Sequence, residues 1–154
     1  MKTIILQASA RAEGNTAEVV RALAREIDAE VVDLLDFHVL PFSYEQEYPA
    51  EDDFLRLING LLRYDQIVFA SPVYWYAMSG PLKIFFDRLS DLLKSQKPTG
   101  RKLRGKQMSV LSCSDDDTVN DSFYAAFRLS AEYLGMTYGF ERHAWVQDGD
   151  VHFR

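Results

Sequence analysis

The segment from Gln66 to Arg88, QIVFASPVYWYAMSGPLKIFFDR, places the strongest constraint on the fold of this chain. It begins with the apolar run of residues 67–70, which is typical of a strand buried on both faces of a sheet. Ser79-Gly80-Pro81 then marks a helix start, because serine and glycine are good N-cap residues and proline is favoured in the first turn. The apolar positions that follow recur at helical spacing. This order of strand, turn and helix predicts one unit of a parallel α/β sheet.

The turn within this segment contains three consecutive aromatic residues, Tyr74, Trp75 and Tyr76. Open α/β sheets bind ligands at the carboxyl ends of their strands, beside turns such as this one. Exposure of three aromatic rings to water is unfavourable unless a flat ligand covers them or they pack inward. From the turn alone, a plug over the core and a ligand site are equally good interpretations.

A second candidate ligand loop follows the first predicted strand, residues 3–8. The small residues 9–16 (SARAEGNT) separate this strand from a helix predicted over 16–28. Backbone N–H groups converge at a helix N-terminus, and the helix dipole favours an anion, so the arrangement suits a phosphate. The side chains that would add donors are Ser9, Arg11, Asn15 and Thr16. Neither GxGxxG nor GxxxxGK[ST] is present, so an ordinary turn capped by Asn15 or Thr16 remains an alternative.

Strand and helix patterns alternate along the rest of the chain. Further strands are predicted at 29–34, at 107–112 and from 137 onward, and further helices at 51–64, 80–94 and 118–134. Asp148-Gly149 indicates a hairpin near the end of the chain. The alternation predicts the α/β class with a doubly wound parallel sheet. In the strand order 2-1-3-4-5 the two candidate ligand loops are neighbours at the point where the order reverses.

Two connections differ from ordinary short loops. Residues 35–50 form a long loop that carries several aromatic side chains, and we expect it to contribute to a substrate entrance. Residues 94–106 contain six basic and no acidic side chains. This basic stretch joins a helix end to a strand start, at the opposite end of the sheet from the ligand loops. We therefore interpret it as a solvated connection, in which cations also stabilise the helix C-terminus.

Composition and charge limit the possible partners. A formal net charge of -6 argues against nucleic acid or an anionic membrane as the main partner. The apolar runs are too short to span a bilayer, and the first residues lead into a strand pattern without a cleavage site, so neither a membrane span nor a signal peptide is expected. Cys113 is the only cysteine, which excludes an intrachain disulfide and fits a reducing cytoplasm. Three scattered histidines indicate no metal site.

The two loop motifs resemble those of the flavodoxin-like NAD(P)H-dependent FMN reductases and quinone reductases. The matching segments are Ser9-Ala10-Arg11 with Gly14-Asn15-Thr16, and Ser71 to Tyr76 with Met78 to Arg88. The resemblance extends from Lys2 to about Gly135 and includes Leu103 to Lys106 before strand four. It implies that residues 1–154 form a single flavodoxin-like domain that binds FMN and uses NAD(P)H. It also implies a cytoplasmic homodimer.

The resemblance assigns expected roles to three groups of residues. The loop after strand one holds the flavin phosphate in that family, which here implies Ser9, Arg11, Asn15 and Thr16. The loop after strand three lies along the isoalloxazine, which implies Pro72, Val73, Tyr74, Trp75 and Tyr76. The turn after strand four approaches the flavin ring, which implies Ser112, Cys113 and Ser114. The cofactor carries the chemistry, so no side chain is expected to act as a catalytic base.

The chain departs from the family pattern at two main points. The turn after strand four reads Cys113-Ser114-Asp115-Asp116-Asp117 where the family usually has glycine, and we interpret these aspartates as a solvated turn. The helix that usually closes the fold after strand five is missing. By the rule of right-handed crossovers, the first helix is then left to cover one sheet face alone. We expect a homodimer partner to cover the gap, with the C-terminal hairpin as the alternative.

The predicted function is an FMN-dependent oxidoreductase that passes electrons from NAD(P)H to a quinone, a flavin or a similar small-molecule acceptor. A non-catalytic flavin-binding or electron-transfer protein is the alternative, and a yellow protein that does not consume NAD(P)H would identify it. A phosphorylation-dependent receiver shares the strand order. Its acidic residues follow strands one and three, however, where this chain has Ser9 and Ser71. A reactive thiol at Cys113 is also conceivable, although a buried and inert cysteine is the commoner case.

Overall fold

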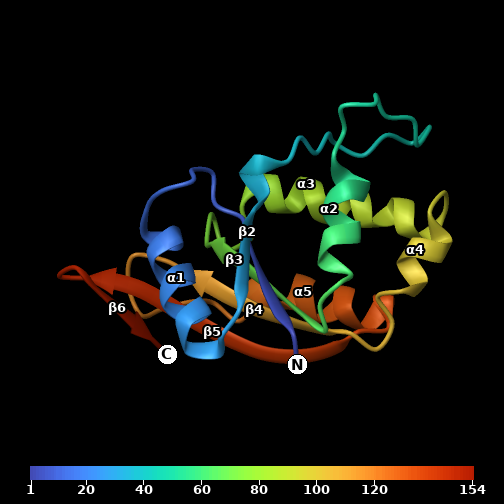
Figure 1. Cartoon of the computed structure of the whole chain (residues 1–154). Helices are drawn as coiled ribbons and strands as arrows, with labels where there is room; N and C mark the ends of the chain where they lie inside the picture. Colours follow the sequence, from blue (N-terminus) through green and yellow to red (C-terminus); the bar gives the residue numbers. More distant parts are fainter.

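The computed structural model describes all 154 residues and contains one six-stranded sheet with helices on both faces (Figure 1). The strands are β1 (Thr3–Gln7), β2 (Glu30–Asp33), β3 (Gln66–Pro72), β4 (Gln107–Cys113), β5 (Thr137–Gln147) and β6 (Asp150–Phe153). Their order is β2-β1-β3-β4-β5-β6, in which the first five strands are parallel and β6 pairs antiparallel with β5. The predicted order of the first five strands is therefore confirmed, and the C-terminal hairpin adds a sixth.

Five α-helices connect the strands, with two short 3₁₀ segments. They are α1 (Asn15–Ile27), α2 (Phe54–Leu61), α3 (Gly80–Arg88), α4 (Lys97–Arg101) and α5 (Ser122–Leu134), with η1 (Leu34–Asp36) and η2 (Leu89–Leu93). The helix predicted over 80–94 ends at Arg88 and continues as η2. The helix predicted from residue 118 begins at Ser122, because the Asp116 carboxylate accepts hydrogen bonds from the backbone and hydroxyl of Thr118. Such local side-chain bonds compete with helix formation. None of the helices has the length and apolarity needed to cross a membrane.

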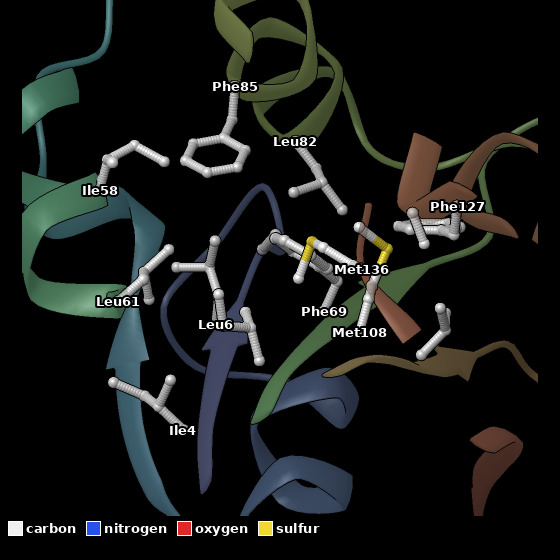
Figure 2. Packing of buried hydrophobic residues seen from close by; sticks show 14 of the residues in the cluster. Ile4, Leu6, Ile58, Leu61, Phe69, Leu82, Phe85, Met108, Phe127 and Met136 are labelled. Carbon is white, nitrogen blue, oxygen red and sulfur yellow. The ribbon is translucent and has the colours of Figure 1, made fainter. Parts of the chain in front are cut away.

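The two faces of the sheet carry cores of different size. Alternate residues of β1 point to opposite faces, so Leu6 joins the larger core and Ile5 the smaller one. Figure 2 shows side chains of α2, α3 and α5 converging on Leu6 and Phe69 in the larger core. The smaller core consists mainly of one side of α1 packed on the sheet, with Leu23 fully buried. The predicted distribution, with α1 on one face and α2, α3 and α5 on the other, is confirmed.

The C-terminal hairpin helps to cover the face of α1. Its side chains Val146, Val151 and Phe153 pack against the smaller core. The guanidinium of Arg142 lies 4.3 Å from the centre of the Phe153 ring and pairs with Glu26 of α1. Part of the surface that we expected a partner subunit to cover is therefore covered within the chain, as the alternative interpretation held.

The long loop before α2 is fixed by a buried arginine at the end of α3. The Arg88 guanidinium makes paired hydrogen bonds of 2.8 and 2.9 Å to the Asp52 carboxylate and one of 2.8 Å to Asp91. It also donates to the carbonyl oxygen of Leu40, and its Cζ atom lies 3.5 Å from the centre of the Tyr48 ring. These contacts hold the loop over the carboxyl end of α3, on the α4 side of the molecule (Figure 1).

Candidate functional site

A cavity of about 290 Å³ opens at the carboxyl ends of β1, β3 and β4. Strands β1 and β3 are neighbours whose onward connections run to opposite faces, so the cavity lies at the topological switch point of the sheet, where such folds bind ligands. Three loops line it, with Ser9, Arg11, Asn15 and Thr16 from the first, Pro72, Val73 and Tyr74 from the second, and Cys113, Ser114 and Asp115 from the third.

The structure thus brings together all but three of the predicted site residues, the exceptions being Trp75, Tyr76 and Ser112. Asp115 also lines the cavity, although the sequence suggested only a solvated turn there. None of residues 35–50 lines it, so the expectation that this loop forms its entrance is not met within one chain. The loop instead borders a separate cavity beside Arg88 and Asp91, because the buried Arg88 contacts hold it there.

The first loop presents hydrogen-bond donors that have no partner within the chain. Helix α1 begins at Asn15 with Gly14 as its N-cap, so the suggestion that Asn15 or Thr16 caps the helix is wrong. No side chain caps the helix, and the backbone N–H groups of Asn15, Thr16 and Ala17 make no hydrogen bond within the chain. Free N–H groups of this kind, together with the helix dipole, attract an anion.

Arg11 lies beside these donors because of Gly14. The backbone of Gly14 has φ 156° and ψ -163°, a combination that is essentially restricted to glycine. A Cβ atom at this position would lie only 2.5 Å from Nε of Arg11, so the guanidinium rests directly on the glycine backbone. A side chain at residue 14 would therefore displace the one cation that lines the cavity. The sequence motif and the geometry agree on a cradle for a phosphate group.

The remaining contacts of the first loop hold its shape. The backbone N–H of Arg11 donates to the buried hydroxyl of Ser9 at 3.4 Å. The side-chain amide of Gln7, at the end of β1, donates to the carbonyl oxygen of Ala12 at 3.0 Å. Sequence reasoning did not assign a role to Gln7, since a glutamine at the end of a buried strand carries no motif of its own.

The second loop is a tight turn that projects its aromatic residues into solvent. Tyr74 and Ala77 exchange two backbone hydrogen bonds of 2.9 and 3.1 Å. Trp75 and Tyr76 occupy the centre of the turn with φ values of 49° and 68°. Positive φ at both central positions defines a type I′ turn, for which Asn-Gly is preferred. Bulky residues in this conformation are unusual and cost about 1–2 kcal/mol each.

These aromatic rings do not plug the core. The exposed fraction is 92% for Trp75, 65% for Tyr76 and 43% for Tyr74. Tyr74 lines the switch-point cavity, whereas Trp75 and Tyr76 stand outside its lining. Of the two interpretations that the sequence left open, packing of the turn into the core is therefore wrong.

Ser79 anchors this loop to the sheet. Its hydroxyl accepts the N–H of Leu82 and so caps α3, as the sequence predicted. The same hydroxyl donates to the carbonyl oxygen of Ala8 at the end of β1, and the backbone N–H of Ser79 donates to Oγ of Ser71 at 3.0 Å. One buried serine therefore connects the two strand ends that border the cavity.

The third loop is held by a histidine that the sequence did not single out. His143 of β5 is buried, and its Nε2 lies 2.8 Å from the carbonyl oxygen of Asp116 and 3.0 Å from Oγ of Ser114. A carbonyl oxygen only accepts, so Nε2 donates to Asp116, and Nδ1 lies 2.8 Å from the Ser112 hydroxyl. The Ser112 hydroxyl also lies 2.6 Å from that of Tyr124. Ser112 therefore faces this network and does not line the cavity.

Cys113 lines the cavity as a largely buried thiol. Burial raises the pKa of Cys113, a side-chain hydrogen bond with Thr16 acts in the opposite direction, and the negative charge of Asp115 adds to the rise. A thiol with a raised pKa contains little thiolate at neutral pH and is a poor nucleophile. The geometry therefore favours the packing role for Cys113 over a reactive one.

Taken as a donor set, the residues around the cavity fit FMN. The free N–H groups, Arg11 and the hydroxyls of Ser9 and Thr16 suit the phosphate. Pro72, Val73 and Tyr74 form an apolar wall beside them. The residues at this end of the sheet therefore combine an anion cradle with a surface suited to a flat ring.

Comparison with known proteins agrees with this geometry. A family model described as NADPH-dependent FMN reductase matches residues 1–146. A protein of Bacillus subtilis (strain 168), named "Putative NAD(P)H-dependent FMN-containing oxidoreductase YwqN", is 31% identical over 115 residues, which cover 71% of this chain and 62% of that protein. The chain thus spans less than two thirds of the length of this relative.

Solved structures share the fold. The Trp repressor binding protein from Bacillus subtilis superposes with a TM-score of 0.73 at 24% identity, over 97% of this chain and 90% of that one. General stress protein 14 from Treponema denticola, solved in complex with FMN, gives a TM-score of 0.66 at 17% identity, over 96% of this chain and 88% of that one. At these identities the likeness establishes a flavodoxin-like architecture. Since the family model covers nearly the whole sequence, the chain belongs to the NADPH-dependent FMN reductase family.

Proposed function

We propose that this protein is an oxidoreductase that binds FMN in the switch-point cavity and uses it to pass electrons from NAD(P)H to a quinone, a flavin or another flat acceptor. The observation that carries the proposal is the convergence, in one cavity, of three unpaired helix N–H groups, one arginine and an aromatic turn. The cytoplasm, where NAD(P)H is available, is the compartment that we propose. FMN, when bound, would supply the hydride-accepting ring and its electron-transfer chemistry.

The phosphate of FMN is assigned to the first loop. Helix N–H groups fixed by α1 require no reorganisation to receive an anion, and Arg11 adds a charge-assisted hydrogen bond. Loss of one such contact weakens binding by about 1.5–3 kcal/mol, or roughly 10- to 150-fold in the dissociation constant. The buried hydroxyls of Ser9 and Thr16 complete the cradle.

The flavin ring is assigned to the space between the second and third loops. Pro72, Val73 and Tyr74 line one part of it, and Cys113 and Ser114 line another. A hydrogen bond of 2.9 Å from the N–H of Val73 to the carbonyl oxygen of Cys113 fixes the separation of the two loops. None of these side chains is required to transfer a proton, so their proposed role is to position the ring and exclude water.

The exposed rings of Trp75 and Tyr76 are assigned to the second substrate. They stand next to Tyr74 but outside the cavity lining, in a backbone conformation that is unfavourable for bulky residues. An unfavourable conformation that displays an apolar ring to water is consistent with a binding role, because strain of this kind gathers at functional sites. A flat nicotinamide or quinone that stacks on these rings would bury their exposed surface.

We also propose a homodimer, through a surface other than the one suggested by the sequence. A groove between the end of α3 and α5 is lined mainly by apolar side chains, including Leu93, Leu129 and Tyr133. Leu129 is 63% exposed and Tyr133 is 76% exposed. Contiguous apolar surface of this kind is typical of protein interfaces. A second copy related by two-fold symmetry would bury the same residues of both chains.

The visible absorption spectrum provides the primary test. The purified protein, supplied with FMN and then passed through a desalting column, should retain flavin bands that bleach under nitrogen on addition of NAD(P)H and recover when a quinone is added. Retained flavin that NAD(P)H does not bleach would identify an electron-transfer or binding protein instead. Absence of retained or titratable flavin would refute the proposal.

The phosphate assignment is tested by comparing FMN with riboflavin, which lacks the phosphate. Arg11→Ala should weaken FMN binding by roughly 10- to 150-fold and leave riboflavin binding nearly unchanged. Arg25→Ala, in the last turn of α1, removes the same charge far from the cavity and serves as the control. Equal losses for FMN and riboflavin would show that Arg11 does not contact the phosphate.

A further inference from the structure

The three consecutive carboxylates after β4 have different surroundings. The Asp116 carboxylate has hydrogen-bond partners within the chain, because it accepts from the N–H of Thr118 at 2.9 Å and from the Thr118 hydroxyl at 2.6 Å. The carbonyl oxygen of Asp117 accepts a hydrogen bond of 2.7 Å from Arg154, and its side chain lies outside the cavity lining. Asp115 is the only acidic residue that lines the switch-point cavity. Its carboxylate forms no ion pair or hydrogen bond within the chain.

The turn that carries Asp115 is held on both sides of this residue. The Ser114 hydroxyl lies 3.0 Å from the carbonyl oxygen of Asp116 and 3.2 Å from that of Thr118. His143 binds the same Asp116 carbonyl from β5. These bonds hold the backbone on both sides of Asp115, whose exposed side chain lines the cavity.

The negative charge of Asp115 acts on groups inside the cavity. The only cation in the lining is Arg11, which comes from the opposite loop and forms no ion pair with Asp115. Burial is the main cause of the raised pKa of Cys113, and the charge of Asp115 contributes to the same rise. The carboxylate thus disfavours negative charge on a neighbouring group at the ring end of the cavity.

We propose that Asp115 lowers the reduction potential of FMN bound in this cavity, by disfavouring reduced FMN relative to oxidised FMN. This inference rests on the proposed function. Hydride transfer from NAD(P)H moves two electrons and one proton to the flavin, releases NAD(P)⁺ and leaves the flavin ring with one additional negative charge. Asp115 repels that added charge. Its repulsion of the FMN phosphate is the same in both redox states and cancels from the comparison.

A unit charge acting over about 10 Å, at an effective dielectric constant of about 20, changes a binding constant by on the order of tenfold. For a two-electron couple, a tenfold change in the ratio of binding constants corresponds to about 30 mV. The proposed consequence is a flavin that reduces its acceptor more readily.

The test is the affinity of wild-type protein, Asp115→Asn and Asp117→Asn for oxidised FMN and for chemically reduced FMN under nitrogen. Asp115→Asn should strengthen binding of reduced FMN about tenfold more than binding of oxidised FMN, and should raise the potential of bound flavin by about 30 mV in a dye-equilibration measurement. Asp117→Asn removes the same charge from the same turn but not from the cavity lining, and should change the ratio by less than about twofold.

If the ratio of the affinities for reduced and oxidised FMN changes equally in both variants, or in neither, the proposal is overturned. A wild-type protein that binds neither form of FMN would overturn the proposed function itself, which is a distinguishable outcome. If Asp115→Asn does not fold, the salt dependence of the flavin potential in the wild-type protein tests the proposal. Salt screens the charge of Asp115, so the potential of bound flavin relative to free flavin should rise between 0.01 and 0.5 M salt. A potential independent of salt would contradict the role of Asp115.

Discussion

Replacement of Arg88 by methionine should remove most of the stability of the loop that precedes α2. Methionine has a similar length but cannot pair with the two carboxylates that Arg88 contacts. The Arg88 side chain is 2% exposed, and those of Asp52 and Asp91 are 6% and 4% exposed. The substitution therefore leaves two buried carboxylates without their cation, and also removes the contact of the guanidinium with the Tyr48 ring.

Removal of one partner from a buried ion pair costs about 3–5 kcal/mol, because the remaining charge stays desolvated. The carboxylates of this cluster retain some donors. Asp52 still accepts from the N–H groups of Leu40 and Phe54, and Asp91 still accepts from the Tyr48 hydroxyl. These remaining bonds moderate the loss but do not replace a cation. A cost of this size is a large fraction of the stability of an ordinary domain, about 5–15 kcal/mol.

Urea unfolding followed by circular dichroism measures the global free energy of unfolding, and hydrogen exchange over residues 38–53 measures local opening of the loop. The matched control is Arg56→Ala, which removes an exposed arginine that pairs with Asp53 and should cost no more than about 1 kcal/mol. The triple variant Arg88→Met, Asp52→Asn, Asp91→Asn should recover part of the loss, because no buried charge remains. If Arg88→Met costs as little as Arg56→Ala and leaves the loop protected, the reasoning is refuted.

The pH dependence supplies an independent check on the same cluster. Burial of Asp52 opposes its ionisation, but hydrogen bonds from Arg88, Leu40 and Phe54 outweigh burial and lower the pKa of Asp52 from 3.8. A carboxyl with a lowered folded-state pKa stabilises the fold above its unfolded pKa, and the contribution is lost as pH falls through the folded-state pKa. The stability difference between wild type and Arg88→Met should therefore narrow as pH decreases below about 4. A difference that is constant between pH 7 and pH 3 would contradict this account.

Three further predictions concern the candidate site and its surroundings. Trp75→Asn with Tyr76→Gly installs the preferred type I′ pair and should raise the free energy of unfolding by about 1–2 kcal/mol in thermal unfolding. The same variant should have a higher KM for flat acceptors. Unchanged kinetics would show that the turn is not part of the site. Gly14→Ala forces a strained φ and displaces Arg11, so FMN titration should show weaker binding, whereas wild-type affinity would argue against the cradle. Leu129→Glu with Tyr133→Lys should convert a dimer to a folded monomer in sedimentation at micromolar concentration, and a full-length wild-type monomer would refute the proposed interface.

Local signals were enough to establish most of the elements and their order. Apolar periodicity located the five parallel strands and four of the five α-helices, and Ser79-Gly80-Pro81 identified the start of α3. The helix α4 was not predicted, because it lies in the basic stretch of residues 94–106 that we interpreted as a solvated connection. Crossover handedness then placed α1 on one face of the sheet and the other main helices on the opposite face. These features depend on residues that are neighbours in the chain or on general geometric rules, so one sequence contains the information.

Element boundaries depended on contacts that periodicity does not encode. The apolar pattern of α3 continues to residue 93, but the helix ends at Arg88, where the guanidinium pairs with Asp52, and becomes 3₁₀. Asp116 similarly delays the start of α5 by binding Thr118. Both boundaries depend on hydrogen bonds made by charged side chains. A hydrophobic pattern shows only that these positions are polar and does not show which bonds they form.

Only the tertiary structure decided which residues meet at the site. Ser112 lies within β4 and its hydroxyl contacts His143 and Tyr124, whereas Ser114, in the turn directly after β4, contacts His143 and also lines the cavity. Arg88 determines where the long loop lies through contacts with residues 36 and 48 positions away in the chain. The sequence supplied the local chemistry of each loop, because helix caps and glycine conformations are local properties. Which side chains face the cavity depended on contacts between residues far apart in the chain, and those are fixed only when the whole sheet has packed.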